Sequence, residues 1–433
     1  MAQKKRYVQV GLGGRAPFFY EAVAGRFKDT SELVALCDVN QTRMDYANSV
    51  LKDKFGYKAL PTYGIDKFDE MVTTHKPDAV IVTSIDRTHH HYIVRAMELG
   101  YDVISEKPMT IDEVKCQEIL DTVERTGRKL RVTFNYRYAP HNTKIRELLR
   151  DGVIGDVQAV HFEWTLDTAH GADYFRRWHR DKRNSGGLLV HKATHHFDLV
   201  NFWLGSRPKT VFAMGDLRFY GRENAEKRGV TKFYSRVHGS PNAVGDPFAY
   251  DPAESPAMKA IYLDAEKDDG YVRDQSVFGD GISIEDTMSL LVRYQTGAVM
   301  SYQLVAYSPW EGFRVNFTGT KGRLEADILE RSYVSLAGPR EMEGAANSRK
   351  ITVRPQFAPP YEVEIPEGEG GHGGGDPVLL NDIFGTPGPD PFHRAASHID
   401  GAMSILTGIA GNKSIRTGLP VEVDSLVKFP GQK

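Results

Sequence analysis

The sequence predicts an α/β fold with two domains. The chain has 433 residues, which is longer than one ordinary domain. Its first third alternates short β-branched runs with helical segments, the pattern of a parallel sheet. Farther along, residues 157–168 alternate between apolar and polar side chains, which indicates the first strand of a second sheet.

The composition is that of a globular protein, with 40% hydrophobic and 26% charged residues and a net charge of −2. This balance argues against a nucleic acid or an anionic membrane as partner. Cys37 and Cys116 give no disulfide framework, so we expect a reduced, cytoplasmic protein. We find no signal peptide and no apolar run long enough to span a membrane.

The first predicted strand, Arg6–Gly11, runs directly into a glycine-rich turn. Gly11, Gly13 and Ala16 match the pattern G-x-G-x-x-G/A, and a helical segment over 18–27 follows. Glycines let backbone N–H groups approach a pyrophosphate, and the helix N-terminus adds partial positive charge. The pattern alone is common, but its place between a strand and a helix favours a dinucleotide site. The turn residues assigned to the cofactor are Gly11, Gly13, Gly14 and Arg15.

The second predicted strand, Leu33–Asp38, ends at Asp38, which follows Ala16 by 22 residues. An acidic residue there binds the ribose hydroxyls and repels a 2′-phosphate. The next two positions hold no arginine, so NAD is favoured over NADP, although Arg43 on the following helix leaves some ambiguity. Asn40 is assigned to the cofactor as well. The alternative is that Asp38 only caps the end of its strand.

Three more predicted strands, Asp78–Thr83, Asp102–Ser105 and Leu130–Phe134, complete a five-stranded sheet in a first domain over 1–135, followed by a second over 136–433. Ligands of open α/β sheets bind beyond the carboxyl ends of the strands. The polar residues at these ends are therefore assigned to the cofactor (Thr83, Ser84, His89, Glu106, Lys107 and Asn135) or to the substrate (Tyr136 and Arg137). The consecutive histidines 89–91 point in different directions from a helix, which argues against a metal cluster.

The stretch Ser185–Gly205 is predicted to form a helix that begins after small residues and ends at a glycine. Residues three or four apart share a helical face, so His191, His195 and Asp198 should lie in one stripe, opposite an apolar one. Two imidazoles and a carboxylate on a buried face are equipment for proton transfer. A histidine pair at this spacing also suits zinc, but we find no third ligand and predict no metal.

Five motifs in order resemble the Gfo/Idh/MocA oxidoreductases, which include glucose–fructose oxidoreductase and inositol dehydrogenase: GLGGRA at 11–16, AMELG at 96–100, SEKP at 105–108, GTKG at 319–322 and GLPVEV at 418–423. The resemblance implies a Rossmann dinucleotide-binding domain followed by an α/β domain with a large, mostly antiparallel open sheet. It implies that Lys107 contacts the substrate and the nicotinamide ribose, and that Pro108 follows a cis peptide bond.

The stretch 185–198 resembles the family's G-G-G-x-L-x-D-x-G-x-H-x-x-D element. His195 takes the place of the catalytic histidine, and we expect it to be the general base, since imidazole suits proton transfer near neutral pH. The alternative is a structural histidine. Asp198 matches the trailing aspartate, whereas His191 replaces the catalytic aspartate and Lys192 takes a usually apolar place. His191 could orient a sugar hydroxyl or share a proton with His195.

Two further stretches carry candidate substrate ligands, and a long insertion lies between them. The basic segment 170–184 should border the cleft, with Arg176, Arg177, Trp178 and His179 as candidates. It is either a solvated charged loop or a site for an anionic substituent on the substrate. A turn-rich insertion at about 218–282 should be functional or form oligomer contacts. His372 lies in the glycine-rich stretch 341–375, as a site residue or part of a flexible turn.

These observations predict an NAD-dependent redox enzyme that transfers hydride between nicotinamide and a ring carbon of a sugar, polyol or glycoside. Lys107, His195 and His191 are the expected catalytic residues, and Lys192, Asp198 and His372 join the substrate-binding set. One alternative is an NAD-dependent glycosidase that oxidises a ring carbon transiently, eliminates the aglycone, adds water and reduces the ring again, including on a sulfonated or carboxylated glycoside. Another is a non-catalytic NAD-binding regulator. We expect a homo-oligomer, dimer or tetramer.

Overall fold

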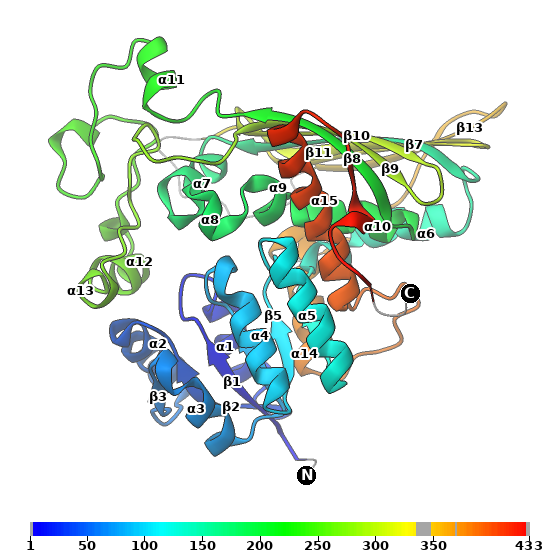
Figure 1. The fold of residues 1–433 in the computed structure, drawn as a ribbon. Helices are drawn as coiled ribbons and strands as arrows, with labels where there is room; N and C mark the ends of the chain where they lie inside the picture. The colour runs from blue at the N-terminus through cyan, green and yellow to red at the C-terminus, as the bar shows by residue number, and fades with distance from the viewer. Residues whose placement is uncertain (1–2, 335–347, 369, 430–433) are drawn as a thin grey trace.

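Two β-sheets organise the chain, and each is the centre of one layer of the molecule (Figure 1). The computed structural model describes residues 3–334, 348–368 and 370–429. Parts of the glycine-rich stretch, residues 341–347 and 369, lie outside the described residues. No helix among those described is long and apolar enough to cross a membrane.

The first sheet is parallel, with strand order β3-β2-β1-β4-β5-β6. Its strands are β1 (Lys5–Val10), β2 (Ser31–Cys37), β3 (Thr62–Tyr63), β4 (Ala79–Val82), β5 (Asp102–Ser105) and β6 (Leu130–Val132). The prediction of five strands is wrong by one, because β3 has only two residues and is too short to give a pattern. The predicted Rossmann arrangement is confirmed.

Helices cover both faces of this sheet: α1 (Pro17–Ala24), α2 (Gln41–Phe55), α3 (Phe68–His75), α4 (His89–Glu98) and α5 (Glu113–Thr126). A sixth, α14 (Gly375–Phe384), comes from the far end of the chain (Figure 1). Its Phe384 ring packs edge-on against Tyr7 at 5.1 Å. The C-terminal part of the chain thus helps to build the core around β1.

The second sheet has nine strands in the order β14-β13-β12-β11-β7-β10-β9-β8-β15. Its neighbours pair antiparallel except β7 with β10, so the predicted mostly antiparallel sheet is confirmed. Its strands are β7 (Val157–Asp167), β8 (Pro208–Asp216), β9 (Thr287–Tyr294), β10 (Val299–Ser308), β11 (Glu311–Gly319), β12 (Gly322–Arg331), β13 (Ser348–Pro355), β14 (Tyr361–Glu362) and β15 (Val421–Glu422). The sequence analysis assigned no strand within the glycine-rich stretch 341–375, where the polar sequence SRKITVRP forms β13, next to the edge strand β14.

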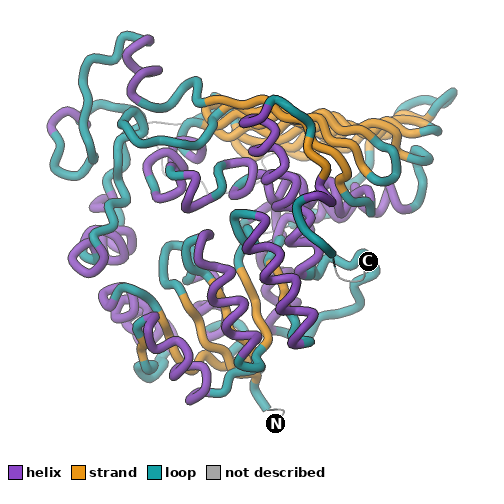
Figure 2. Tube along the Cα trace, viewed as in Figure 1, coloured by secondary structure: helices purple, strands orange, loops and turns teal. Residues whose placement is uncertain are grey.

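Helices line the face of this sheet that is turned toward the first domain (Figure 2). They are α6 (Pro140–Arg150), α7 (His170–Arg176), α8 (Lys182–Ser185), α9 (Leu188–His191), α10 (Ala193–Leu204) and α15 (His398–Thr417). The basic segment 170–184 is therefore partly helical rather than a loop.

The predicted single helix over 185–205 is interrupted at Lys192. There the His195 N–H bonds to the carbonyl of Lys192, three residues back, which tightens the turn between α9 and α10. The contrast between a polar and an apolar stripe also fails, because the helix lies between the sheet and the first domain. Phe197 of the apolar stripe and His195 and Asp198 of the polar stripe are all buried.

The segment between β8 and β9 extends from the second sheet down to α2 of the first domain (Figure 1). It contains the short helices α11 (Arg222–Lys227), α12 (Pro256–Met258), η7 (Lys259–Leu263) and α13 (Glu266–Asp269). The Asn40 amide donates to the carbonyl of Ala265 at 2.8 Å, and the Thr42 N–H donates to Asp268 at 2.8 Å. This segment, called the insertion below, therefore bridges the two domains.

Candidate active site

A cavity of about 620 Å³ lies between the carboxyl ends of the first sheet, helices α7 to α9 and the insertion. The predicted site residues on its wall are Gly11, Gly13, Gly14, Arg15, Asp38, Thr83, Ser84, His89, Glu106, Lys107, Asn135, Arg177, Trp178, His179, His191 and His372. Predicted residues outside this wall are Asn40, Tyr136, Arg137, Arg176, Lys192, His195 and Asp198. One cavity therefore brings together most of the cofactor residues and part of the substrate set.

The glycine-rich turn forms one end of this cavity. Gly11 has φ of +87°, and a Cβ on it would overlap the backbone of Thr83 and Ser84 at the end of β4. Only glycine adopts this conformation without strain and permits this approach of two strand ends. The turn delivers the chain to α1, where Pro17 stands in the first turn. This geometry fits the pyrophosphate of a dinucleotide.

Asp38 follows β2 beside this turn. Its carboxylate accepts hydrogen bonds from the backbone N–H groups of Leu12 at 2.5 Å and Asn40 at 2.9 Å. Burial raises the pKa of Asp38, and nearby Arg43 opposes that shift. The Arg43 guanidinium lies 3.6 Å from Asp38 and 2.8 Å from Asp269 of the insertion. Asn40 instead caps α2, its side chain accepting from the Arg43 N–H.

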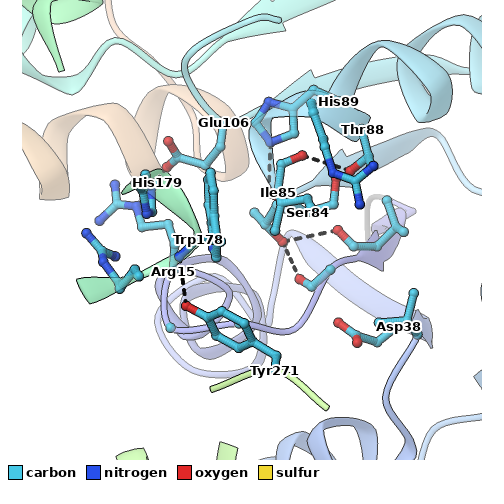
Figure 3. A pocket seen from close by; sticks show the side chains of 18 of the residues that line it. Arg15, Asp38, Ser84, Ile85, Thr88, His89, Glu106, Trp178, His179 and Tyr271 are labelled. Carbon is cyan, nitrogen blue, oxygen red and sulfur yellow. Dashed lines mark hydrogen bonds and ion pairs between the residues drawn. The ribbon is translucent and has the colours of Figure 1, made fainter. Parts of the chain in front are cut away.

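The insertion supplies wall residues that sequence reasoning missed, namely Tyr262, Asp269 and Tyr271. The Gly14 N–H donates to the Tyr262 hydroxyl at 3.1 Å. The Trp178 N–H donates to the Tyr271 hydroxyl at 3.2 Å, as Figure 3 shows. The length of the insertion indicated a function, but no motif marks these tyrosines. They close the cavity over the glycine-rich turn.

Lys107 lies on the wall immediately after β5, and the Lys107–Pro108 peptide bond is cis, as the resemblance implied. The preceding Glu106 pairs with Arg15 at 2.7 Å across the cavity floor. His89 is fully buried, and one ring nitrogen contacts the carbonyl of Pro108 at 2.8 Å. The other ring nitrogen contacts the carbonyl of Ser84 at 3.0 Å (Figure 3). His89 thus connects the backbone just after Lys107 to the end of β4.

His372 joins the glycine-rich stretch to the first domain. Its Nδ1 contacts Asp376 at 3.0 Å, and Asp376 also accepts from the Asn135 amide at 2.7 Å. Although burial opposes ionisation, His372 beside it leaves the pKa of Asp376 below its usual value. This network holds the segment before α14 against the end of the first domain.

His191 and His195 occupy different places. His191 lies on the cavity wall, where its Nδ1 is 2.5 Å from the Asp86 carboxylate and its ring is 4.2 Å from that of His179. His195 lies one layer deeper, with its ring 5.0 Å from Tyr136 and 6.0 Å from His372. Burial, reinforced by nearby cations, lowers the pKa of both imidazoles well below the usual value. Both rings are therefore held in the neutral form.

Several predicted substrate residues that lie outside the wall form contacts that stabilise the structure next to the cavity. The buried Arg137 guanidinium donates to Asp198 at 2.7 Å and to Asp400 at 2.9 Å. The Tyr136 hydroxyl donates to Glu330 at 3.1 Å, and the Lys192 ammonium lies 5.9 Å from the Tyr136 ring centre. These contacts hold α10 and the end of β6 together beneath the cavity.

The solvated-loop alternative for the basic segment is wrong for its central residues. Arg176 is buried, and Asp173 pairs with Arg176 at 3.1 Å, Arg177 at 2.8 Å and Arg273 at 2.7 Å. These arginines hold the pKa of Asp173 well below its usual range despite its burial. Of this cluster, Arg177 reaches the cavity wall.

A parallel sheet with a glycine-rich turn, an acidic residue after the second strand and a lysine after β5 defines a dinucleotide-dependent oxidoreductase. Comparisons agree: residues 5–134 match the oxidoreductase family's NAD-binding Rossmann fold, and residues 146–423 match its C-terminal alpha/beta domain. The chain belongs to the Gfo/Idh/MocA oxidoreductase family.

The chain is 37% identical to the putative oxidoreductase YteT of Bacillus subtilis (strain 168) over 98% of this chain and 99% of that protein. It is 34% identical to inositol 2-dehydrogenase of Rhizobium meliloti (strain 1021) over 31% of this chain and 39% of that protein. Its fold is similar to that of the WlbA dehydrogenase from Bordetella pertussis, solved with NADH and UDP-GlcNAcA, with a TM-score of 0.62, 18% identity and coverage of 97% and 99% of the two chains.

Proposed function

We propose that this protein is an NAD-dependent dehydrogenase that acts on a carbinol carbon of a sugar, polyol or glycoside. The observation that carries the proposal is one cavity shared by Gly11, Asp38, Lys107 and His191. It joins a fitting dinucleotide site to a lysine and a neutral imidazole. The relatedness to inositol 2-dehydrogenase supports a polyhydroxylated substrate. A homo-oligomeric state and a cytoplasmic location stay predictions of the sequence.

NAD rather than NADP is proposed because of the charges around Asp38. A 2′-phosphate would meet the Asp38 carboxylate, and Arg43, the nearby cation, already pairs with Asp269 at 2.8 Å. The Arg43 Nε also donates to the carbonyl of Ile261 at 3.0 Å. The Arg43 guanidinium is thus already bonded to the insertion.

When bound, NAD supplies the acceptor or donor of hydride. The Lys107 ammonium would stabilise negative charge that develops on the reacting oxygen of the substrate. In the oxidation direction, the hydroxyl proton would pass to a neutral imidazole, and His195 stays our proposal for that base. His191, at the wall, would contact the substrate first.

A redox-neutral glycosidase is the second candidate, and the closure of the cavity by Tyr262 favours it. A cofactor held beneath the insertion would exchange slowly, which suits a reaction that returns the hydride to the same sugar ring. Arg177, on the wall, would suit an anionic group on such a substrate.

One assay separates these functions. The protein is incubated with sugars, inositol and aryl glycosides, with and without added NAD, while NADH absorbance and aglycone release are followed. Stoichiometric NADH supports the dehydrogenase, and aglycone without net NADH supports the glycosidase. If neither product forms and NAD still binds, the result would support the non-catalytic regulator. In the active assay, His195→Ala should abolish turnover and leave NAD affinity largely intact; surviving turnover would remove His195 as the base.

A further inference from the structure

We propose that Asp86, His179 and His191 form a binding site for a divalent transition-metal ion, of the zinc class, at the edge of the cavity, where the two histidines line the wall and Asp86 contacts His191. Asp86 begins the turn after β4, His179 lies in the turn after α7, and His191 ends α9. One potential ligand atom from each residue lies within 4.8 Å of the other two. The set combines two imidazoles and one carboxylate, which are the ligands of many catalytic zinc sites.

The three side chains are buried, with exposed fractions of 3% for Asp86, 3% for His179 and 7% for His191. Buried polar groups normally have partners, because an unpaired one loses its hydration. Yet Nδ1 of His179 has no hydrogen-bond partner among the described residues.

Aromatic side chains hold the two imidazoles in place. The Trp178 ring stacks on His179 with 3.5 Å between ring centres, and Tyr174 meets His191 edge-on at 5.3 Å. Figure 3 shows His179 beside Trp178 in the cavity. In a tetrahedral zinc site the ligand atoms are about 3.3 Å apart, so the hydrogen-bonded pair of Asp86 and His191 at 2.5 Å would have to open by less than 1 Å.

Nearby cations oppose a dication here. Lys107 and Arg177 both act electrostatically on Asp86, although Arg177 is paired with Asp173 at 2.8 Å. We therefore expect weaker binding than at a closed site with four protein ligands. The rival state of these residues is a metal-free hydrogen-bonded pair of Asp86 and His191.

The position of the three residues gives the metal a role that rests on the proposed function. His179 and His191 face the same cavity as Lys107, so the fourth coordination position would be open to a substrate hydroxyl. A metal there lowers the pKa of that hydroxyl. Its proton would pass to His195 and its carbon would give hydride to the nicotinamide, leaving a carbonyl group. A metal ion here would contradict the expectation of no metal, and it would give the histidine at position 191 a function as a ligand.

The test is metal binding by the full-length protein. Chelator-treated protein is dialysed against Zn²⁺ or Co²⁺, bound metal is measured by mass spectrometry, and the visible spectrum of Co²⁺ reports its ligands. We expect about one ion per chain and a tetrahedral Co²⁺ spectrum. His179→Gln and Asp86→Asn should each lower metal affinity at least tenfold. The control is His238→Gln, which alters an exposed histidine that pairs with Asp251 at 3.1 Å, and it should bind like wild type.

Absence of a stoichiometric ion in the wild type, or unchanged binding in His179→Gln with native thermal unfolding, would overturn the metal site. NAD binding and NADH formation are measured on the same samples. Turnover that is unaffected by the chelator would show that the metal takes no part in the reaction, and it would leave the proposed function intact. A protein that binds the metal but not NAD would fail the proposed function instead.

Discussion

The two ends of the cavity differ in whether backbone or side chains form them. The cofactor end is made of backbone: a glycine-rich turn pressed against β4, with Asp38 tied to two backbone N–H groups. The substrate end is made of side chains from distant segments, with His191 meeting Asp86 across 105 positions of the chain. The first end should therefore be sensitive to an added Cβ, and the second to the chemistry of single side chains.

Among the residues of the cavity wall, the largest effect is expected from Lys107→Met at the substrate end. This change keeps the length of the side chain and removes the charge that stabilises the reacting oxygen. We expect kcat to fall about 10²–10³-fold, while NAD affinity changes little. Steady-state kinetics and NAD titration measure the two quantities. A fall in NAD affinity that accounts for the whole loss would assign Lys107 to the cofactor end instead.

Gly11→Ala tests the backbone end. The added Cβ would overlap Thr83 and Ser84 at positive φ, so the free energy of unfolding should fall by about 3 kcal/mol. Gly13→Ala is the matched control, because its Cβ would meet only the Tyr262 hydroxyl, at 3.9 Å. It should change stability by less than about 0.5 kcal/mol and still weaken NAD binding. Equal destabilisation by both changes, in chemical denaturation, would refute this account of the turn.

Acid should destabilise the second domain through a buried imidazole. His141 begins α6 and has no hydrogen-bond partner among the described residues, and burial lowers its pKa to about 3. Above pH 6.5 the imidazole is neutral in both states. Below it the unfolded chain binds a proton that the folded chain refuses, so stability falls from pH 6.5 toward pH 3.

This histidine should cost about 2 kcal/mol of stability at pH 5 relative to pH 7. His141→Gln cannot titrate and should lose that much less over the same range, whereas His161→Gln, on an exposed strand position, should behave like wild type. Denaturation at both pH values makes the comparison. Identical pH dependence in all three proteins would show that His141 is protonated or open to solvent.

The smallest effect is expected where the insertion meets the glycine-rich turn. Tyr262→Phe removes the hydroxyl that accepts from the Gly14 N–H at 3.1 Å and leaves the ring in place. We expect NAD to dissociate about fivefold faster, because one lost hydrogen bond corresponds to roughly 1 kcal/mol. Stopped-flow fluorescence measures that rate. An unchanged rate would mean that this hydroxyl takes no part in holding the cofactor.

Local patterns explain which features the sequence revealed. The turn at Gly11 and the acid at Asp38 are a few residues from the strands that position them, so their spacing predicts their geometry. The cis bond at Pro108 and the large, mostly antiparallel form of the second sheet came from the resemblance, because the alternation over 157–168 indicated only its first strand. β3 and β13 were missed because one is very short and the other is polar.

The substrate end depends on contacts that no spacing encodes. Asp86 belongs to no motif, and the fold brings it together with His179 and His191 from segments far apart in the sequence. His195, whose ring lies 5.0 Å from that of Tyr136, stands in α10, after the interruption at Lys192 that the sequence did not predict. The tyrosines of the insertion carry no motif at all.

The central claim is hydride transfer between a carbinol carbon and nicotinamide in this cavity. The most direct measurement is a single turnover with NAD and sugars, inositol or glycosides deuterated at carbon, followed by mass spectrometry of cofactor and product. We predict that deuterium moves to the nicotinamide, and stays there for a dehydrogenase or returns to the ring for a redox-neutral enzyme. Bound NAD that never acquires deuterium from any of these substrates would contradict the claim.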